Sequence, residues 1–108
     1  MDKLLFALAA AINSRASPLQ MLAPIKYPGR QLQPQTLPDG LISVTAAKWG
    51  YEYKHRGRLP QTLPPPADTA QIRKALNTAI APRYAVREVI NQQKSITIII
   101  IKIQEAKS

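Results

Sequence analysis

The distribution of proline constrains this chain more than any other feature. Nine of its ten prolines fall between Pro18 and Pro66, and only Pro82 lies outside that interval. Proline lacks a backbone N–H and fixes φ, so it interrupts helices and strands. The pattern predicts a helix over 1–16, an extended arm over 17–40, a strand over 41–56, a Pro-rich connection over 57–67, a helix over 68–93 and a strand over 95–104.

The arm over 17–40 is apolar and nearly neutral, with a net charge of +1. Flexible linkers are polar, and arms that bind nucleic acid are dense in Lys and Arg. We therefore expect this arm to lie in a groove on a protein. Its residues expected to contact a neighbouring protein are Ile25, Tyr27, Leu32 and Leu37.

A five-residue repeat occurs at 34–38 and again at 60–64, where both copies read PQTLP. On one interpretation the two copies enter and leave the strand between them, and Leu37 and Leu63 pack on their own domain. On the other, the copies are two similar extended ligands that bind equivalent pockets on neighbouring copies of a partner. The repeat itself is compatible with both.

An apolar run from Leu4 to Ile12 follows one acid and one base. It is too short to span a bilayer, and the flanking charges cancel, which is unlike a signal peptide. We therefore expect no membrane partner and no secretion through a cleaved signal peptide. As a helix, the run places its larger side chains on one face that needs a covering surface, in this chain or in another protein; they are Leu4, Leu5, Leu8 and Ile12.

The strand over 41–56 alternates apolar and polar residues, with a phase slip at Ala47-Lys48 that predicts a bulge or a bend. Beyond the slip, aromatic rings occupy one face and cations the other. Stacking rings next to cations are typical of nucleic-acid binding, but on opposite faces they do not easily serve one ligand. The candidate nucleic-acid residues are Trp49, Tyr51, Lys54, Arg56 and Arg58.

The helix predicted over 68–93 begins at a capping box, in which Asp68 accepts a hydrogen bond from the amide of Gln71. Pro82 interrupts its apolar face, so the helix either kinks near Ala81 or ends there before a second helix begins. The following strand is apolar on both faces, which is typical of the middle of a sheet. Its Ile99 and Ile101 are expected to contact a neighbouring subunit.

These elements predict an α+β fold with a two- or three-stranded sheet, one long helix, an N-terminal helix and an extended Pro-rich arm. The chain divides into an arm region over 1–40 and a small α/β module over 41–108. Two strands and one helix do not cover a strand that is apolar on both faces. The missing layer would come from the N-terminal helix, from a second copy or from a larger complex. Parallel and antiparallel pairing of the strands both remain open.

Composition argues against catalysis, because the chain has no Cys, one His and six acids. His55 has only Glu52 nearby, which is neither a triad nor a dyad. We therefore expect no enzymatic activity, cofactor, metal or small-molecule substrate. The main hypothesis is a non-enzymatic structural subunit of a large assembly, best a virus or phage particle, located in a virion or an intracellular assembly. Its partners would be other protein subunits, in a homo- or hetero-oligomer.

The alternative is a basic nucleic-acid-binding protein, such as a ribosomal or other ribonucleoprotein component. A formal net charge of +9 favours an anionic neighbour, which is either nucleic acid or an acidic protein surface.

Overall fold

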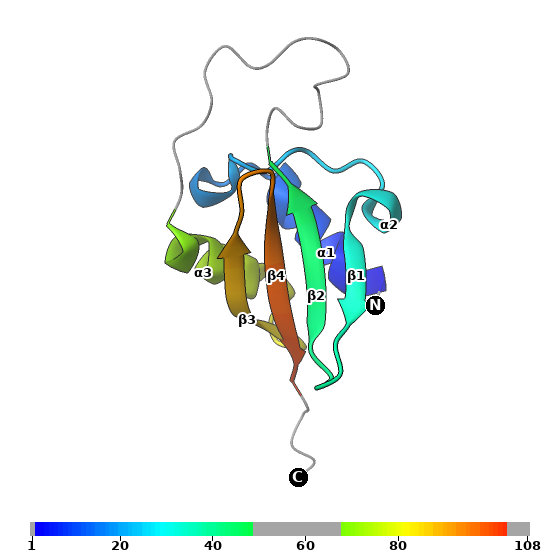
Figure 1. Ribbon diagram of the computed structural model, residues 1–108. Coiled ribbons are helices and arrows are strands. Elements are labelled where there is room, and N and C mark those ends of the chain that lie inside the picture. Colours follow the sequence, from blue (N-terminus) through cyan, green and yellow to red (C-terminus); the bar gives the residue numbers. More distant parts are fainter. Residues whose placement is uncertain (1, 49–67, 104–108) are drawn as a thin grey trace.

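A computed structural model describes residues 2–48 and 68–103 as an α+β fold (Figure 1). A four-stranded antiparallel sheet in the order β1-β2-β4-β3 is its central element. The elements are α1 (Asp2–Asn13), the 3-10 helix η1 (Ser17–Leu19), α2 (Pro28–Gln31), β1 (Gln33–Thr36), β2 (Ile42–Ala47), α3 (Thr69–Ile80), β3 (Tyr84–Asn91) and β4 (Ser95–Lys102).

The most apolar strand, β4, lies in the interior of the sheet between β2 and β3, as its composition predicted. Val44 of β2 lies opposite Ile98, and Val89 of β3 lies opposite the same residue on the other side. The pairing of β2 with β4 is antiparallel, which selects one of the two arrangements left open by the sequence. The sheet has four strands instead of two or three, because β1 and β3 arise from segments expected to be arm and helix.

The helix predicted over 68–93 is wrong beyond Ile80. α3 ends there, a turn containing Pro82 follows, and the chain continues as β3. Proline cannot continue the helical hydrogen-bond pattern. Beyond it, the β-branched Val86 and Val89 turn toward the core of the sheet, where tertiary packing outweighs the helical spacing of the apolar residues. The cap of α3 also differs, because Asp68 accepts from the N–H of Ala70 at 3.1 Å.

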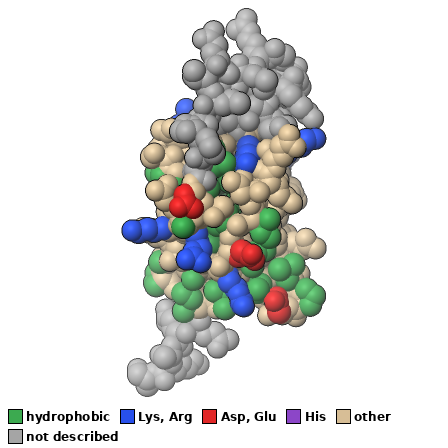
Figure 2. Space-filling view, turned by 60° about the vertical axis from the view of Figure 1, so that its left-hand side comes forward, with side chains coloured by type: hydrophobic (Ala, Val, Ile, Leu, Met, Phe, Trp, Pro, Cys, Tyr) green, Lys and Arg blue, Asp and Glu red, His purple; other side chains and the backbone are tan. Residues whose placement is uncertain are grey.

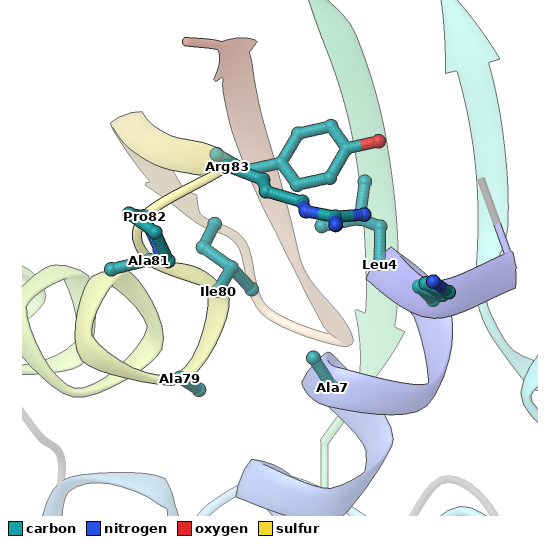
Figure 3. A pocket seen from close by; sticks show the side chains of 9 residues that line it. Leu4, Ala7, Ala79, Ile80, Ala81, Pro82 and Arg83 are labelled. Carbon is teal, nitrogen blue, oxygen red and sulfur yellow. The ribbon is translucent and has the colours of Figure 1, made fainter. Parts of the chain in front are cut away.

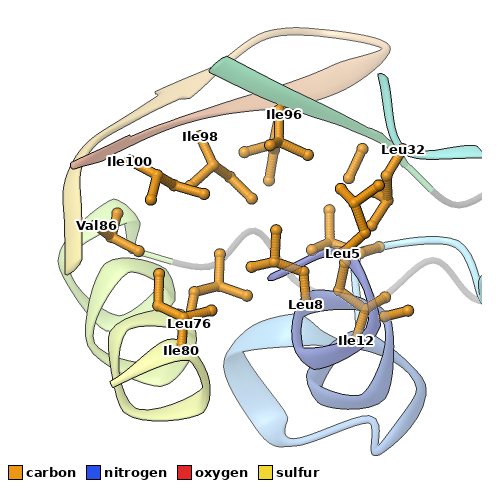
Figure 4. Packing of buried hydrophobic residues seen from close by; sticks show 14 of the residues in the cluster. Leu5, Leu8, Ile12, Leu32, Leu76, Ile80, Val86, Ile96, Ile98 and Ile100 are labelled. Atoms are coloured by element: carbon orange, nitrogen blue, oxygen red, sulfur yellow. The ribbon is translucent and has the colours of Figure 1, made fainter. Parts of the chain in front are cut away.

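The helices α1 and α3 lie side by side on one face of the sheet (Figure 4). Leu8 of α1 and Leu76 of α3 are fully buried against the strands, together with Ile96, Ile98 and Ile100 of β4. The layer missing from the predicted module is therefore supplied on this face by the N-terminal helix of the same chain. Burial of this apolar surface is the main force that holds the layers together.

The arm is extended in part, but it is folded on its own chain. Leu22 forms an antiparallel bridge with Lys48, and the N–H of Ala23 donates to the carbonyl of Ala47 at 2.9 Å. Ile25 and Leu32 are buried in the core that also contains α1. For Ile25 and Leu32 the groove expected on another protein is thus provided by this chain, whereas Tyr27 of the arm remains exposed.

Candidate protein-interaction surface

The sheet has a second face, opposite α1 and α3, which we call the open face. Directly opposed residues on antiparallel strands share a face, so the pairs of Thr45 with Thr97 and of Ile90 with Thr97 belong to it. No element within residues 2–48 and 68–103 packs over it. Its side chains are Gln33, Gln35, Ser43, Thr45, Ala47, Ala85, Glu88, Ile90, Ser95, Thr97, Ile99 and Ile101.

Isoleucines form the apolar half of the open face, over β3 and β4. Ile99 is half-buried at the centre of β4, whereas Ile90 and Ile101 remain 40% and 39% exposed. Ile103, directly after β4, is 43% exposed. Burial of β4 was predicted on both faces, and among the described residues only the face toward α1 and α3 is fully covered. Exposed aliphatic side chains that are gathered on one face of a sheet, rather than scattered singly, make that face a candidate surface for contact with another protein.

Small polar side chains form the other half of the open face, over β1 and β2. The hydroxyl oxygens of Thr45 and Thr97 lie 3.3 Å apart and form a hydrogen bond across the boundary between the two halves. Ser43 and Gln35 oppose each other on the next pair of strands. This half has few apolar atoms to bury, so the isoleucine half is the stronger candidate for a protein contact.

The two edges of the sheet differ in their capacity to pair with another strand. β1 is four residues long and contains Pro34, which has no N–H to donate. β3 is eight residues long, contains no proline and is bulged between Val86 and Glu88. The N–H of Val86 is directed away from β4, where it donates to Oδ1 of Asn77 at 3.0 Å. β3 is thus the edge with more backbone groups available for pairing.

A small hollow of about 190 Å³ lies between the start of α1 and the end of α3. Leu4 and Ala7 face Ile80 and Pro82 across it, and Arg83 lies at its rim (Figure 3). Its lining is apolar apart from Lys3, Arg83 and Tyr84, and it holds no acid or nucleophile beside a base. A second, shallower hollow of about 570 Å³ lies between η1 and α3. Neither has the residue set of an active site.

On the face that Figure 2 shows, charged side chains are spread rather than gathered in one place. Figure 2 shows, on the side of α3 and β3, Lys and Arg side chains interspersed with acids and hydrophobic side chains. A groove lined by cations, such as nucleic-acid backbones follow, is not evident on the face that this view shows.

The residues expected to contact neighbours fall into four groups. The α1 residues Leu4, Leu5, Leu8 and Ile12 are buried in the chain's own core, as are Ile25 and Leu32 of the arm. Tyr27 is 66% exposed and Leu37 is half-buried. Ile99 and Ile101 both lie on the open face. Leu63 and the candidate nucleic-acid residues Trp49, Tyr51, Lys54, Arg56 and Arg58 lie outside the described residues.

Ile90 and the edge formed by β3 are not predicted from the sequence, because the apolar spacing of this segment favours a helix. The signal present was a cluster of β-branched residues, Val86, Val89 and Ile90, bounded by Pro82 and by a polar turn at 91–94. Such a cluster between turn residues is typical of a strand.

Comparison with known proteins gave no match to a family model, to a curated protein or to a solved structure. Over residues 2–48 and 68–103, no group of His, Asp or Glu side chains is arranged to hold a metal ion. None of the described helices has the length and hydropathy needed to cross a bilayer.

Proposed function

We propose that this protein is a non-enzymatic structural subunit of a larger protein assembly, and that its open face contacts neighbouring subunits. The observation that carries the proposal is the isoleucine half of that face, with Ile99 at the centre of an interior strand and Ile90 and Ile101 beside it. Ile101 follows Ile99 by two residues on β4, and Ile90 lies diagonally across from Ile99 on β3, next to Glu88, which lies directly opposite Ile99. Covering these isoleucines would remove apolar area from water and so favour association.

Further copies of this chain are among the proposed neighbours. Structural shells and tubes are built from repeated copies, which lets a chain of 108 residues form a large particle. A virus or phage particle remains the proposed type of assembly. The arm over 17–40 has no part in this version of the proposal, because its residues Ile25 and Leu32 are occupied in the core.

Sedimentation velocity from about 5 to about 500 μM tests the proposal on the full chain. We expect oligomers larger than a dimer, and we expect the double variant Ile99→Thr/Ile101→Thr to lose them while keeping its circular dichroism spectrum. Threonine keeps the β-branched shape that strands favour but removes apolar area. The matched control is Gln35→Thr, on the polar half of the same face, which should assemble like the wild type.

Two results would count against the proposal. One is a wild-type protein that stays a monomer or dimer over the whole concentration range. The other is a double variant that forms the same large oligomers as the wild type.

Nucleic-acid binding remains a second proposed function, and it is favoured by the formal net charge of +9. If it holds, affinity for a single-stranded RNA should fall steeply as salt rises, because bound cations are released from the phosphates. The triple variant Lys54→Ser/Arg56→Ser/Arg58→Ser should then lose most of that affinity and keep its oligomeric state. Equal affinity in the wild type and the triple variant would contradict this function for the segment.

A further inference from the structure

We propose that β3 pairs antiparallel with β3 of a second copy, so that two sheets join into one of eight strands. The pairing is two-fold symmetric about the point between Arg87 and Glu88, which is the centre of β3. It places Arg87 of each copy opposite Glu88 of the other. This inference rests on the proposed function, because the β3 pairing would be one of the contacts between subunits of that assembly.

The backbone groups along β3 point in directions that favour this pairing. The carbonyl of Arg83 accepts from Ile103, and the N–H of Gln92 donates to Ser95, so positions 83 and 92 point toward β4. Along a strand, the N–H and C=O groups of successive residues point alternately toward and away from the neighbouring strand. Counting inward from positions 83 and 92, and using the outward N–H of Val86, the backbone groups of four residues point away from β4. They are Tyr84, Val86, Val89 and Asn91.

The two-fold register aligns all four of these residues. Tyr84 lies opposite Asn91 of the second copy, and Val86 lies opposite Val89, so that outward groups meet outward groups. Every other antiparallel register aligns at most two of the four. The bulge between Val86 and Glu88 is the reason, since it shifts the alternation by one residue at the centre of the strand.

Side chains that lie on the same face of the sheet meet in this register. Val86 and Val89 both turn toward the core, because their partners on β4 are Ile100 and Ile98. Ala85 and Ile90 both lie on the open face, opposite Ile101 and Thr97. The joined sheet would therefore continue the open face from one copy to the next, with Ile90 of one copy beside Ala85 of the other.

The charges at the centre of β3 also favour this register. Arg87 and Glu88 are both exposed, and in this register each acid faces a base across the two-fold axis. Opposite charges directly across two strands stabilise their pairing, whereas like charges oppose it. The same pair disfavours registers that place Arg87 opposite Arg87 or Glu88 opposite Glu88. The edge is therefore protected against unspecific pairing while it accepts one specific partner.

The side chain of Asn77 competes with the second copy for one of the outward backbone groups of β3. Its Oδ1 occupies the N–H of Val86, one of the four outward groups, at 3.0 Å. In the dimer that N–H would donate to the carbonyl of Val89 of the second copy instead. We therefore expect Asn77→Ala to raise the association constant severalfold, because the competing acceptor is gone.

Charge exchange tests the register. Arg87→Glu alone and Glu88→Arg alone each place like charges across the axis, so each should reduce the association constant about tenfold or more. An equimolar mixture of the two variants restores both opposite-charge pairs and should form heterodimers with the wild-type affinity. Analytical ultracentrifugation with one variant fluorescently labelled measures all three cases. Loss of dimer that mixing does not restore would overturn the proposed register.

Disulfide trapping gives a second readout that is independent of charge. The chain has no Cys, so introduced thiols are the sole reactive ones. Position 85 faces position 90 of the second copy as a non-hydrogen-bonded pair, with Cα atoms about 4.5 Å apart, which suits a disulfide. In either single variant, Ala85→Cys or Ile90→Cys, the two equivalent Cys residues would lie about 17 Å apart. Oxidation should cross-link the mixture of the two variants and neither variant alone.

The outcomes separate this inference from the proposed function. Cross-links in the single variants, or none in the mixture, would overturn the β3 pairing even if large oligomers form through the open face. Conversely, Ile99→Thr/Ile101→Thr should keep the β3 dimer and its cross-link, because neither residue belongs to β3. Cross-linked dimers without larger oligomers would support the β3 pairing and count against the proposed function.

Discussion

The side-chain amide of Asn13 makes two hydrogen bonds with the backbone of Ile25. Its Nδ2 donates to the carbonyl at 2.6 Å, and its Oδ1 accepts from the N–H at 2.7 Å. Asn13 is the last residue of α1 and Ile25 lies in the arm. One side chain therefore ties the arm to the helix and satisfies both backbone groups of a residue that is buried in the core.

Replacing Asn13 with Ala should lower the free energy of unfolding by about 1–3 kcal/mol, because both backbone groups of Ile25 lose their partner. Urea denaturation followed by circular dichroism measures this. The control is Ser14→Ala, which removes an exposed hydrogen bond to the carbonyl of Ala11 and should change stability by less than about 0.5 kcal/mol. Equal stability of the two variants would show that the arm is not held by Asn13.

Ile100 and Ile101 offer a comparison of the two faces of β4. Ile100 is fully buried against the helices, so Ile100→Ala should cost about 2–5 kcal/mol of stability. Ile101 is 39% exposed on the open face, and Ile101→Ala should cost clearly less in a dilute monomer. Thermal unfolding at low protein concentration checks the ranking. The reverse order would mean that the faces of the sheet are assigned wrongly.

Gly40 and Gly29 should respond in opposite ways to alanine. Gly40 has a φ of +83°, a conformation that costs an L-residue about 1–2 kcal/mol, so Gly40→Ala should destabilise the protein by that amount. Gly29 lies in α2, and a Cβ there would meet nothing within 4 Å. Gly29→Ala should be neutral or stabilising by up to about 1 kcal/mol. Melting temperatures of the two variants, compared with the wild type, decide between these signs.

Asn77→Ala should destabilise the monomer by about 0.5–1.5 kcal/mol, because the N–H of Val86 loses its acceptor. Hydrogen exchange of the Val86 amide should become faster in the variant at low protein concentration. Thr78→Ala is the control, since its hydroxyl donates to the carbonyl of Lys74 within α3 and has no contact with the β3 amide. Unchanged protection of Val86 in Asn77→Ala would contradict the role of Asn77 at this edge.

Local patterns were sufficient to predict several parts of the fold. The apolar spacing of Leu4, Leu8 and Ile12 predicted α1, and the alternation of Ile42, Val44 and Ala46 predicted β2. The Ile-rich segment predicted β4 and its position inside a sheet. These patterns are local because 3.6-residue and two-residue periods follow directly from helix and strand geometry.

Local patterns were misleading after Pro82. Val86, Val89 and Ile90 match a helical spacing as well as a bulged strand, so spacing alone did not distinguish the two. Their place in β3 depends on Ile98 and Ile100, which lie on the neighbouring strand and supply the contacts. Part of the open face could not be predicted for the same reason. Ile90 lies on the same face as Ile99 and Ile101 only when its segment is a strand that pairs with β4.

The sequence by itself determined the charge, the lack of Cys, the apolar helix at the start and the Ile-rich strand near the end. Tertiary structure alone decided which partner covers each apolar surface. The α1 face and the arm are covered within this chain, and the open face is not covered by any of the described residues. Burial is a property of residues that are distant in sequence and close in space, so a single segment does not encode it.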